Sequence, residues 1–353
     1  MDEWVESIVQ ELKLRSESGI GPLGSLYLGG GTPSLITPEH LDRILNAVHQ
    51  YFTFREDAEI TLECNPDDLN RDTLHFLYRN GINRLSIGLQ SFQQRDLTLM
   101  RRSHSAEQAG QSVLDAAEAG FDNITIDLIY GVPGQTIEEW ELNLKKAISL
   151  PVTHLSAYHL TFEPGTVFYH WRKKGKLKEA PEALSIAQYR LLRQLTGEGG
   201  FDHYEISNFA RNGKYSTHNL LYWSGESYLG VGPSAHSFHG TTRSWNVASL
   251  KKYMELLQQG EPFSEFETLT TVEQYHDALI TTLRTRWGID PVSLEKRFGA
   301  KYRQIFNQET ALFIEQGIMI QSRNKVAIHP DHWLIADHIF RDLFMDTGGD
   351  NTQ

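Results

Sequence analysis

Short apolar runs separated by helix-patterned segments constrain the fold of this chain more than any other feature. The runs occupy residues 25–30, 58–64, 84–90, 123–131 and 154–162. Several are almost continuously hydrophobic and rich in β-branched residues, which is typical of strands that are buried on both faces. Because helical segments alternate with them, the pattern predicts a parallel α/β sheet, either barrel-like or doubly wound.

Local signals mark where the intervening helices begin and end. Thr37 followed by Pro38 predicts an N-cap with proline in the first helical position. Gly81 and Gly120 stand where helix C-caps belong, just ahead of the next apolar run. Neither GxGxxG nor GK[ST] follows the first run, so a dinucleotide-binding fold and a P-loop are not supported. The barrel-like arrangement is the one we expect.

After residue 162 the alternation of strands and helices stops. The stretch 163–178 predicts an irregular excursion, 182–199 one amphipathic helix, and 317–330 a β-hairpin. We expect four parts: a core barrel over 1–165, an extension that closes it over 166–265, a small, mainly helical and winged-helix-like domain over 266–345, and a disordered tail over 346–353.

Composition narrows the classes of function. The formal net charge is −12 and the only basic cluster spans 171–178, so nucleic acid is not expected as a partner. No stretch approaches the roughly 18 apolar residues of a membrane span, and the charged N-terminus is unlike a signal peptide. We therefore expect a cytoplasmic protein without a transmembrane segment. The single cysteine, Cys64, excludes a disulfide framework and a multi-thiolate metal site built from this chain alone.

Polar residues gather at the carboxyl ends of the runs. Gly29, Gly30 and Gly31 end the first run, Glu63 the second and Gln90 the third, and Asp127 lies near the end of the fourth. Further candidates on the fifth run are Tyr158, His159 and Thr161. Because parallel strands present their carboxyl ends at one edge of the sheet, these groups predict a ligand site there.

The glycine run indicates what such a ligand would be. A turn needs one residue with positive φ, whereas three glycines let a ligand lie against the main chain. Carbonyl groups suit an ammonium ion and amide groups suit a phosphate. Arg102, which with Arg101 precedes a helix start at Ser105, could bind a carboxylate in bidentate fashion. The carboxylates of Glu63 and Asp127 suit ribose hydroxyl groups. A ligand that carries an ammonium group, a carboxylate and ribose hydroxyls is an amino-acid nucleoside such as S-adenosylmethionine.

Several motifs, in order along nearly the whole chain, resemble the HemN/HemW branch of the radical S-adenosylmethionine proteins. They are YLGGGTPSL, TLECNPDDL, GINRLSIGLQSF, ITIDLIYGVPGQT, HLSAYHLTFEPGT and HNLLYWSGESYLGVGPSAHSF. The resemblance implies an incomplete parallel (β/α) barrel with an added C-terminal domain, and S-adenosylmethionine as a cofactor. It implies that the cofactor is contacted by the glycine loop, from Gly29 to Thr32, and by Glu63, Gln90, Arg102 and Asp127.

The segment HNLLYW is similar to an HNxxYW element of HemW-type proteins, which bind haem and act as haem chaperones. The resemblance implies that His218 is an axial ligand or a contact of haem, and that Tyr222 and Trp223 pack against the macrocycle. A structural role stays open: a hydrogen-bonded histidine at a domain seam, followed by a core aromatic pair. The same two interpretations apply to His236 and His239. Expected partners are haem or a porphyrin and haem-receiving proteins, with haem-dependent dimerisation and peripheral membrane contact as further hypotheses.

One departure from the family pattern concerns the CxxxCxxC loop that supplies thiolates to a [4Fe–4S] cluster. We expect that loop, and the first barrel strand before it, upstream of Met1 in a longer parent protein; a degenerate family member without the loop is the alternative. Cys64 cannot replace several thiolates and is expected to be a small buried residue. The chain as given is therefore expected to form no cluster.

Two other functions stay open as alternatives to a haem chaperone. The first is an oxygen-independent coproporphyrinogen III oxidase, which shares almost every cofactor motif. The second is a metal-dependent barrel hydrolase that uses Glu63, Asp127 and His159.

Overall fold

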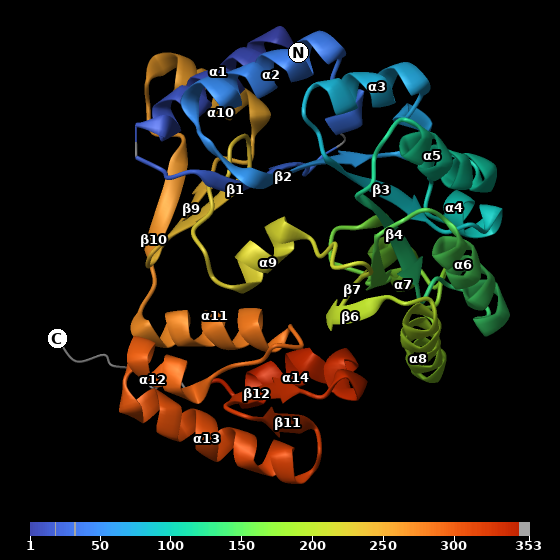
Figure 1. The fold of residues 1–353 in the computed structure, drawn as a ribbon, viewed down its shortest axis with the longest axis vertical. Helices are drawn as coiled ribbons and strands as arrows, with labels where there is room; N and C mark the ends of the chain where they lie inside the picture. Colours follow the sequence, from blue (N-terminus) through green and yellow to red (C-terminus); the bar gives the residue numbers. More distant parts are fainter. Residues whose placement is uncertain (18, 32, 346–353) are drawn as a thin grey trace.

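The fold is built on a curled sheet, seen in a computed structural model that describes residues 1–17, 19–31 and 33–345 (Figure 1). The strand order is β1-β2-β3-β4-β5-β7-β6, and the first five strands run parallel to one another. Their bounds are β1 Leu23–Leu28, β2 Phe54–Cys64, β3 Arg84–Gln90, β4 Ile124–Tyr130 and β5 His154–His159. Two antiparallel strands, β6 Asp202–Glu205 and β7 Asn208–Ala210, complete the sheet beside β5. The expected incomplete (β/α) barrel is confirmed.

Helices cover the outer, convex face of this sheet (Figure 1). They are α1 Asp2–Ser16, α2 Pro38–Tyr51, α3 Arg71–Arg79, α4 Gln94–Leu99, α5 Ala106–Glu118, α6 Ile137–Ser149 and α8 Glu182–Glu198, with short 3-10 turns η1 Pro33–Leu35 and η2 Pro66–Asp68. The predicted helix ends are confirmed: the Thr37 hydroxyl caps α2 by accepting from the N–H of His40, and Gly81 and Gly120 have positive φ angles of 83° and 104°.

The strands alternate between two unlike faces. Leu62, Ile87 and Ile126 point toward the helices and belong to the main hydrophobic core. Residues at the intervening positions, such as Thr61 and Ser86, are also buried but polar. The strands are therefore buried on both sides as predicted, but only the outer side is apolar. Side chains alternate along a strand, so one face can pack against helices while the other lines a polar barrel interior.

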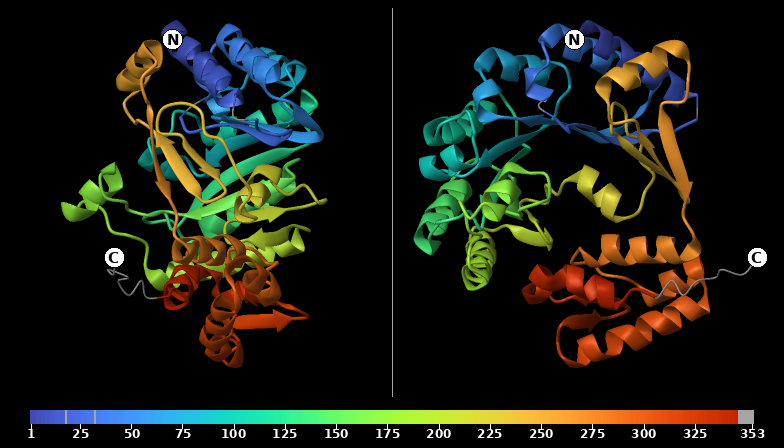
Figure 2. Two further views of the ribbon diagram at one scale, coloured as in Figure 1. Left: turned by 90° about the vertical axis from the view of Figure 1, so that its left-hand side faces the viewer. Right: turned by 180° about the vertical axis from the view of Figure 1, so that it is seen from behind.

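Besides α8, β6 and β7, three further structured parts lie between β5 and the C-terminal part. The first is a short helix, α7 Val167–Lys173, within the stretch predicted to be irregular; that prediction was wrong because the Thr166 hydroxyl caps the helix locally. No residue of α7 is buried, and the helix stands away from the sheet (Figure 2). The second is α9 Thr217–Trp223, which lies between β1 and α11 on the concave side of the sheet (Figure 1). The third is a sheet of order β10-β9-β8 with α10 beside it: β8 His236–His239, β9 Thr242–Asn246, α10 Leu250–Gln259 and β10 Ser264–Thr268.

The C-terminal part is mainly helical, as predicted. Its elements are α11 Thr271–Leu283, α12 Pro291–Phe298, α13 Ala300–Glu315, β11 Met319–Ser322, β12 Lys325–Ile328, η3 Pro330–Ile335 and α14 Ala336–Asp342. The predicted hairpin is confirmed as the antiparallel pair β11–β12. The predicted tail, 346–353, lies outside the described residues. No helix in the described part of the chain is long and apolar enough to cross a membrane.

Candidate functional site

The glycine loop follows β1 and packs against the end of β2. A Cβ atom on Gly29 would lie 2.8 Å from a carboxylate oxygen of Glu63 and 2.7 Å from the ring of Tyr27, so only glycine fits there. Gly30 has a φ of 79°, and its N–H donates to Glu63 Oε2 at 3.2 Å. The side-chain positions of Gly30 and Gly31 face open space. The loop therefore offers bare main chain to a ligand; its last predicted member, Thr32, lies outside the described residues.

Glu63 is held from two sides. The Tyr27 hydroxyl donates to Glu63 Oε1 at 2.8 Å, while the other carboxylate oxygen accepts from Gly30. Burial, together with the nearby Glu63 charge, raises the pKa of Tyr27 above its ordinary value, so the phenol remains a donor at neutral pH. Tyr27 was not among the residues predicted from the sequence. It lies two positions before Gly29. Because side chains alternate between the two faces of a strand, this spacing could have indicated that Tyr27 lies on the same face as the glycine loop.

A second group forms around Gly88. A Cβ atom on this glycine would meet Arg102 Nη2 at 2.8 Å and Gln90 Nε2 at 2.9 Å. Arg102 donates to the carbonyl of Gly88 at 2.9 Å and to Asn65 Oδ1 at 3.2 Å. Both acceptors are neutral, and no carboxylate of the described residues lies within ion-pair distance of Arg102. Burial lowers the pKa of Arg102, and the more distant charges of Asp67 and Asp127 act in the opposite direction. Its guanidinium group is thus positioned but not neutralised.

Gln90 has an unusual backbone conformation. Its φ is 65°, which is uncommon for a residue other than glycine. The pairing of β3 with β4 shifts register between Ile87 and Gln90. Backbone conformations of this kind concentrate at functional sites, where the surrounding structure holds them. Here the conformation belongs to a residue whose amide group lies beside Gly88 and Arg102.

Asp127 lies on the inner face of β4, the strand that follows β3 in the sheet. Burial raises the pKa of its carboxyl group from 3.8 to about 6. Hydrogen bonds to Ser156 and Ser86 favour the ionised form and lower this pKa, but by less than burial raises it. The charge of Glu63 acts in the same direction as burial, and that of Arg84 acts against it. Asp127 therefore changes its charge near pH 6, unlike an ordinary exposed aspartate.

The three residues of the hydrolase alternative do not form a metal site, although the charges of Glu63 and Asp127 act on each other. His159 Nε2 lies 2.9 Å from Ser185 Oγ, at the far edge of the parallel strands. Over residues 1–17, 19–31 and 33–345, no cluster of three or more His, Cys, Asp or Glu side chains is arranged to hold a metal ion. Cys64 is buried, as expected, and burial raises the pKa of its thiol.

His218, at the start of α9, is fixed to the inner face of β1. Its Nδ1 atom lies 3.0 Å from Ser25 Oγ, and its ring stacks on Tyr27 with a centroid distance of 4.7 Å. The N–H groups of Thr217 and His218 both donate to the carboxylate of Glu59, at 2.9 and 3.0 Å. Burial lowers the pKa of His218, which favours the neutral imidazole. Tyr27 thus touches both His218 and Glu63.

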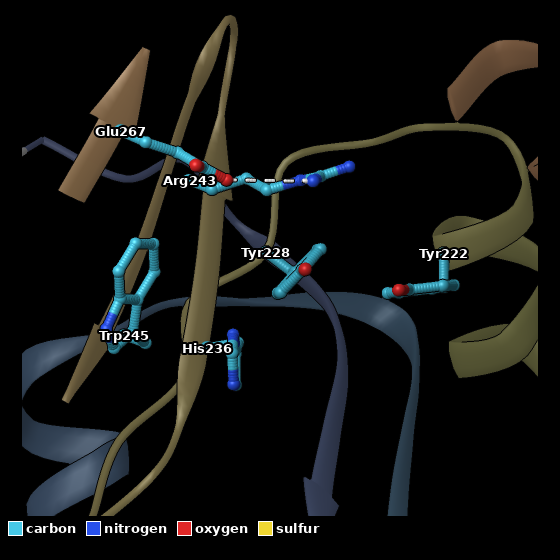
Figure 3. A pocket seen from close by; sticks show the side chains of 6 residues that line it. All are labelled: Tyr222, Tyr228, His236, Arg243, Trp245 and Glu267. Atoms are coloured by element: carbon cyan, nitrogen blue, oxygen red, sulfur yellow. Dashed lines mark ion pairs between the residues drawn. The ribbon is translucent and has the colours of Figure 1, made fainter. Parts of the chain in front are cut away.

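The other end of α9 faces a different space. Tyr222 is 44% exposed and its ring centre lies 5.3 Å from that of Tyr228. Trp223 packs under the guanidinium group of Arg284, 4.9 Å from the ring centre. A cavity of about 770 Å³ opens beside Tyr222 (Figure 3); its lining residues are Tyr222, Tyr228, His236, Arg243, Trp245 and Glu267. His218 and Tyr222, predicted as parts of one haem site, therefore face different surroundings.

Comparison with known proteins accounts for this organisation. The Radical SAM superfamily profile matches residues 2–147, and the HemN C-terminal domain profile matches residues 269–331. The chain is 33% identical over 343 residues to the heme chaperone HemW of Bacillus subtilis, covering 96% of this chain and 90% of that protein. The chain belongs to the HemW family. A second HemW, from Mycobacterium tuberculosis strain H37Rv, is 31% identical over 344 residues, covering 97% of this chain and 86% of that protein.

A solved structure shares the whole fold. Coproporphyrinogen III oxidase (HemN) from Escherichia coli superposes with a TM-score of 0.83 at 24% identity, covering 98% of this chain and 83% of that one. In this HemW-family chain the predicted cofactor residues, from Gly29 to Asp127, fall inside the Radical SAM match. His218, Tyr222 and His236 fall between the two matched ranges. The HemW assignment made from the motifs is confirmed, and neither the oxidase nor the hydrolase alternative is favoured.

Proposed function

We propose that this chain is a haem-binding chaperone that takes up haem and passes it to recipient proteins, and that its barrel binds S-adenosylmethionine. The observation that carries the proposal is the match, over nearly the full length of both chains, to relatives named heme chaperone HemW. The α9 segment HNLLYW supports haem binding, because it brings an aromatic side chain, Tyr222, to an open cavity.

The inner rim of the barrel fits S-adenosylmethionine. The main chain at Gly30 and Gly31 is open for the ammonium group, and Arg102, which lacks a carboxylate partner among the described residues, would take the carboxylate. Glu63 and Asp127 would accept hydrogen bonds from the ribose hydroxyls or the ammonium group, and Gln90 would contact the nucleoside. When bound beside a reduced cluster, this cofactor supplies radical chemistry in the radical SAM superfamily.

The residues present do not fit an iron–sulfur cluster. Cys64 is the only cysteine of the chain. Its thiol is buried and lies 3.6 Å from the carbonyl oxygen of Leu62. A cluster needs several thiolates, and burial opposes the ionisation of this one. We therefore assign to these residues the binding of S-adenosylmethionine and no step of radical chemistry. We assign haem binding to α9 and the residues around it.

Spectroscopy tests the haem-binding part of the proposal. Ferric haem titrated into the protein should shift and sharpen the Soret band with saturation at a fixed stoichiometry. The loaded protein should then transfer haem to an apo-haem protein, with the recipient's spectrum as the readout. A Soret band that stays that of free haem at every ratio would contradict haem binding, and binding without transfer would contradict the chaperone role.

Calorimetry with matched arginine variants tests the S-adenosylmethionine site. Arg102→Lys should weaken binding by about tenfold or more, because lysine cannot form the bidentate contact. Arg101→Lys is the control, since Arg101 is exposed and packs over the ring of Trp171 at 5.3 Å. Equal affinities of the two variants for S-adenosylmethionine would show that Arg102 does not contact this ligand.

A further inference from the structure

The open cavity beside α9 has one wall made by the small sheet. His236 on β8 pairs with Trp245 on β9, and Phe238 pairs with Arg243. Partners across antiparallel strands point to the same side, and neighbours along a strand point to opposite sides. His236, Trp245 and Arg243 therefore share the face that lines the cavity, whereas His239 at the end of β8 points away from it.

The opposite wall comes from α9, which contributes Tyr222 (Figure 3). Tyr228 belongs to the sheet wall, because its backbone exchanges two hydrogen bonds with that of Phe238 on β8. Its ring centre lies 5.3 Å from that of Tyr222 and 6.2 Å from that of Phe238. On the same wall the ring of His236 lies 6.3 Å from that of Trp245, with the planes inclined by 34°. The cavity thus presents one aromatic ring from α9 and two aromatic rings with an imidazole from the sheet (Figure 3).

The charges of the cavity are largely paired already. Arg243 forms an ion pair with Asp277 and lies 3.7 Å from Glu267. This arginine fixes β9 to α11 and β10, and it is not available as a free binding site for an anion. The imidazole of His236, in contrast, is exposed, and neither of its ring nitrogens has a hydrogen-bond partner among the described residues.

These features select for a flat, conjugated, metal-containing ligand. Aromatic rings bind such a ligand through its faces, an unpaired imidazole is a common ligand of haem iron, and the volume of about 770 Å³ is within the range of about 300–1,000 Å³ typical of small-molecule and cofactor sites. Because the cavity is open and its arginine is already paired, the propionate groups of a haem would point into solvent.

We propose that haem is seated in this cavity with His236 as the iron ligand, with Tyr222 and Tyr228 beside the macrocycle and with Trp245, whose plane is close to that of the imidazole, in contact with the macrocycle through its edge. The inference rests on the proposed haem-binding function and names its site. His218 does not line the cavity, and its Nδ1 atom and ring face are in contact with Ser25 and Tyr27. Its role is to position α9, so that Tyr222 reaches the cavity.

The backbone around His236 is closely fixed. A Cβ atom on Gly230 would lie 2.2 Å from the carbonyl oxygen of His236, so only glycine fits beside it. The N–H of Gly230 also donates to Ser237 Oγ at 3.0 Å. The start of β8 is thereby held in place before any ligand arrives, which lowers the ordering cost of binding.

The experiment compares haem titrations of the full chain with those of three histidine variants. His236→Ala should lose the ligand-field features of the bound spectrum and bind haem at least tenfold more weakly, and free imidazole should restore the spectrum. His239→Ala should bind as the unsubstituted protein does. His218→Ala should keep the iron ligation, as judged by electron paramagnetic resonance.

Titration with metal-free protoporphyrin separates iron ligation from packing. His236→Ala should change the affinity for metal-free protoporphyrin by no more than about twofold. Trp245→Leu should weaken the binding of both haem and metal-free protoporphyrin.

The outcomes are distinguishable. An unchanged spectrum and affinity in His236→Ala would overturn the assignment of the iron ligand. Loss of ligation in His218→Ala alone would place the iron at the start of α9 instead, and the haem-binding function would stand. No haem binding by the unsubstituted protein would refute the proposed function together with this site.

Discussion

At the scale of single residues, Tyr27 connects two parts of the molecule that are far apart in sequence. Its hydroxyl donates to Glu63 beside the glycine loop, and its ring stacks on His218 of α9. A hydroxyl group buried against a carboxylate makes a charge-assisted hydrogen bond, which is stronger than a neutral one. Tyr27 therefore fixes the geometry of the proposed cofactor rim and of α9 at once.

Tyr27→Phe removes the hydroxyl group and keeps the ring. We expect the free energy of unfolding to fall by about 1.5–3 kcal/mol, because the substitution deletes a hydrogen bond to a charged group. Urea denaturation measures the change. The control is Tyr78→Phe, whose side chain is 51% exposed, and it should change stability by less than about 0.5 kcal/mol. Equal effects of the two substitutions would mean that the Tyr27 hydroxyl bond contributes nothing measurable.

Asp127 should give S-adenosylmethionine binding a pH dependence. Burial raises its pKa to about 6, so the carboxylate that accepts hydrogen bonds forms only as the pH rises through that value. We expect calorimetric affinity to increase from pH 5 to pH 7 and to level off above, while Asp127→Asn gives a flat profile. A flat profile in the unsubstituted protein would contradict the assignment.

The same carboxyl group has the opposite effect on stability. Its folded pKa is raised from 3.8 to about 6, so between these values the folded chain holds a proton that the unfolded chain has lost. Its contribution to stability is therefore largest below about pH 4 and is lost as the pH rises through about 6. Compared with Asp127→Asn, the unsubstituted protein should lose stability over this interval in urea denaturation; a gain would contradict the raised pKa.

At the scale of elements, α9 depends on the rest of the fold for its position. A helix of 7 residues is too short to be stable alone in water. Glu59 supplies the anchor, since its carboxylate accepts the N–H groups of Thr217 and His218 and pairs with the buried Arg84 at 3.7 Å. This carboxylate, and not the propensity of the segment, sets where Tyr222 points.

Glu59→Gln should therefore detach α9. We expect a loss of about 3–5 kcal/mol, because Arg84 is left buried without its partner, and a change in Trp223 fluorescence as the helix loosens. Glu56→Gln on the exposed start of the same strand is the control and should leave both signals unchanged. Unaltered stability in Glu59→Gln would show that α9 is held by other contacts.

Elements with strong local signals were predictable, and those fixed by distant contacts were not. The parallel strands, the Thr37 cap and the β11–β12 hairpin follow from patterns within a few residues. The anchoring of α9 joins Glu59 to Thr217, which are 158 positions apart. The φ of Gln90 is set by its surroundings. His218 lies outside the cavity beside Tyr222 because of where the β10-β9-β8 sheet packs. No local sequence pattern encodes the position of that sheet.

At the scale of the whole molecule, the N-terminal helix holds the β10-β9-β8 sheet against the barrel. Glu11 of α1 is fully buried and accepts from the N–H of Gly232, from Asn246 and from the Tyr253 hydroxyl, at 2.8, 2.8 and 2.5 Å. Apolar side chains of α1, α2 and α10 form a second hydrophobic core around this network. The start of the chain thus supports residues that lie more than two hundred positions later.

Glu11→Gln should loosen that support without unfolding the barrel. The amide cannot accept all of these hydrogen bonds, so buried donors on β9 and α10 lose their partner, which costs about 1–3 kcal/mol for each group. Hydrogen–deuterium exchange should speed up in α10 and β9 and stay unchanged in β3 and β4. Haem affinity should fall, because β9 carries Trp245 into the cavity.

Glu3→Gln, on the exposed side of the same helix, is the control and should change none of these signals. Faster exchange spread evenly over the barrel would show that α1 stabilises the whole fold and not the β10-β9-β8 sheet in particular.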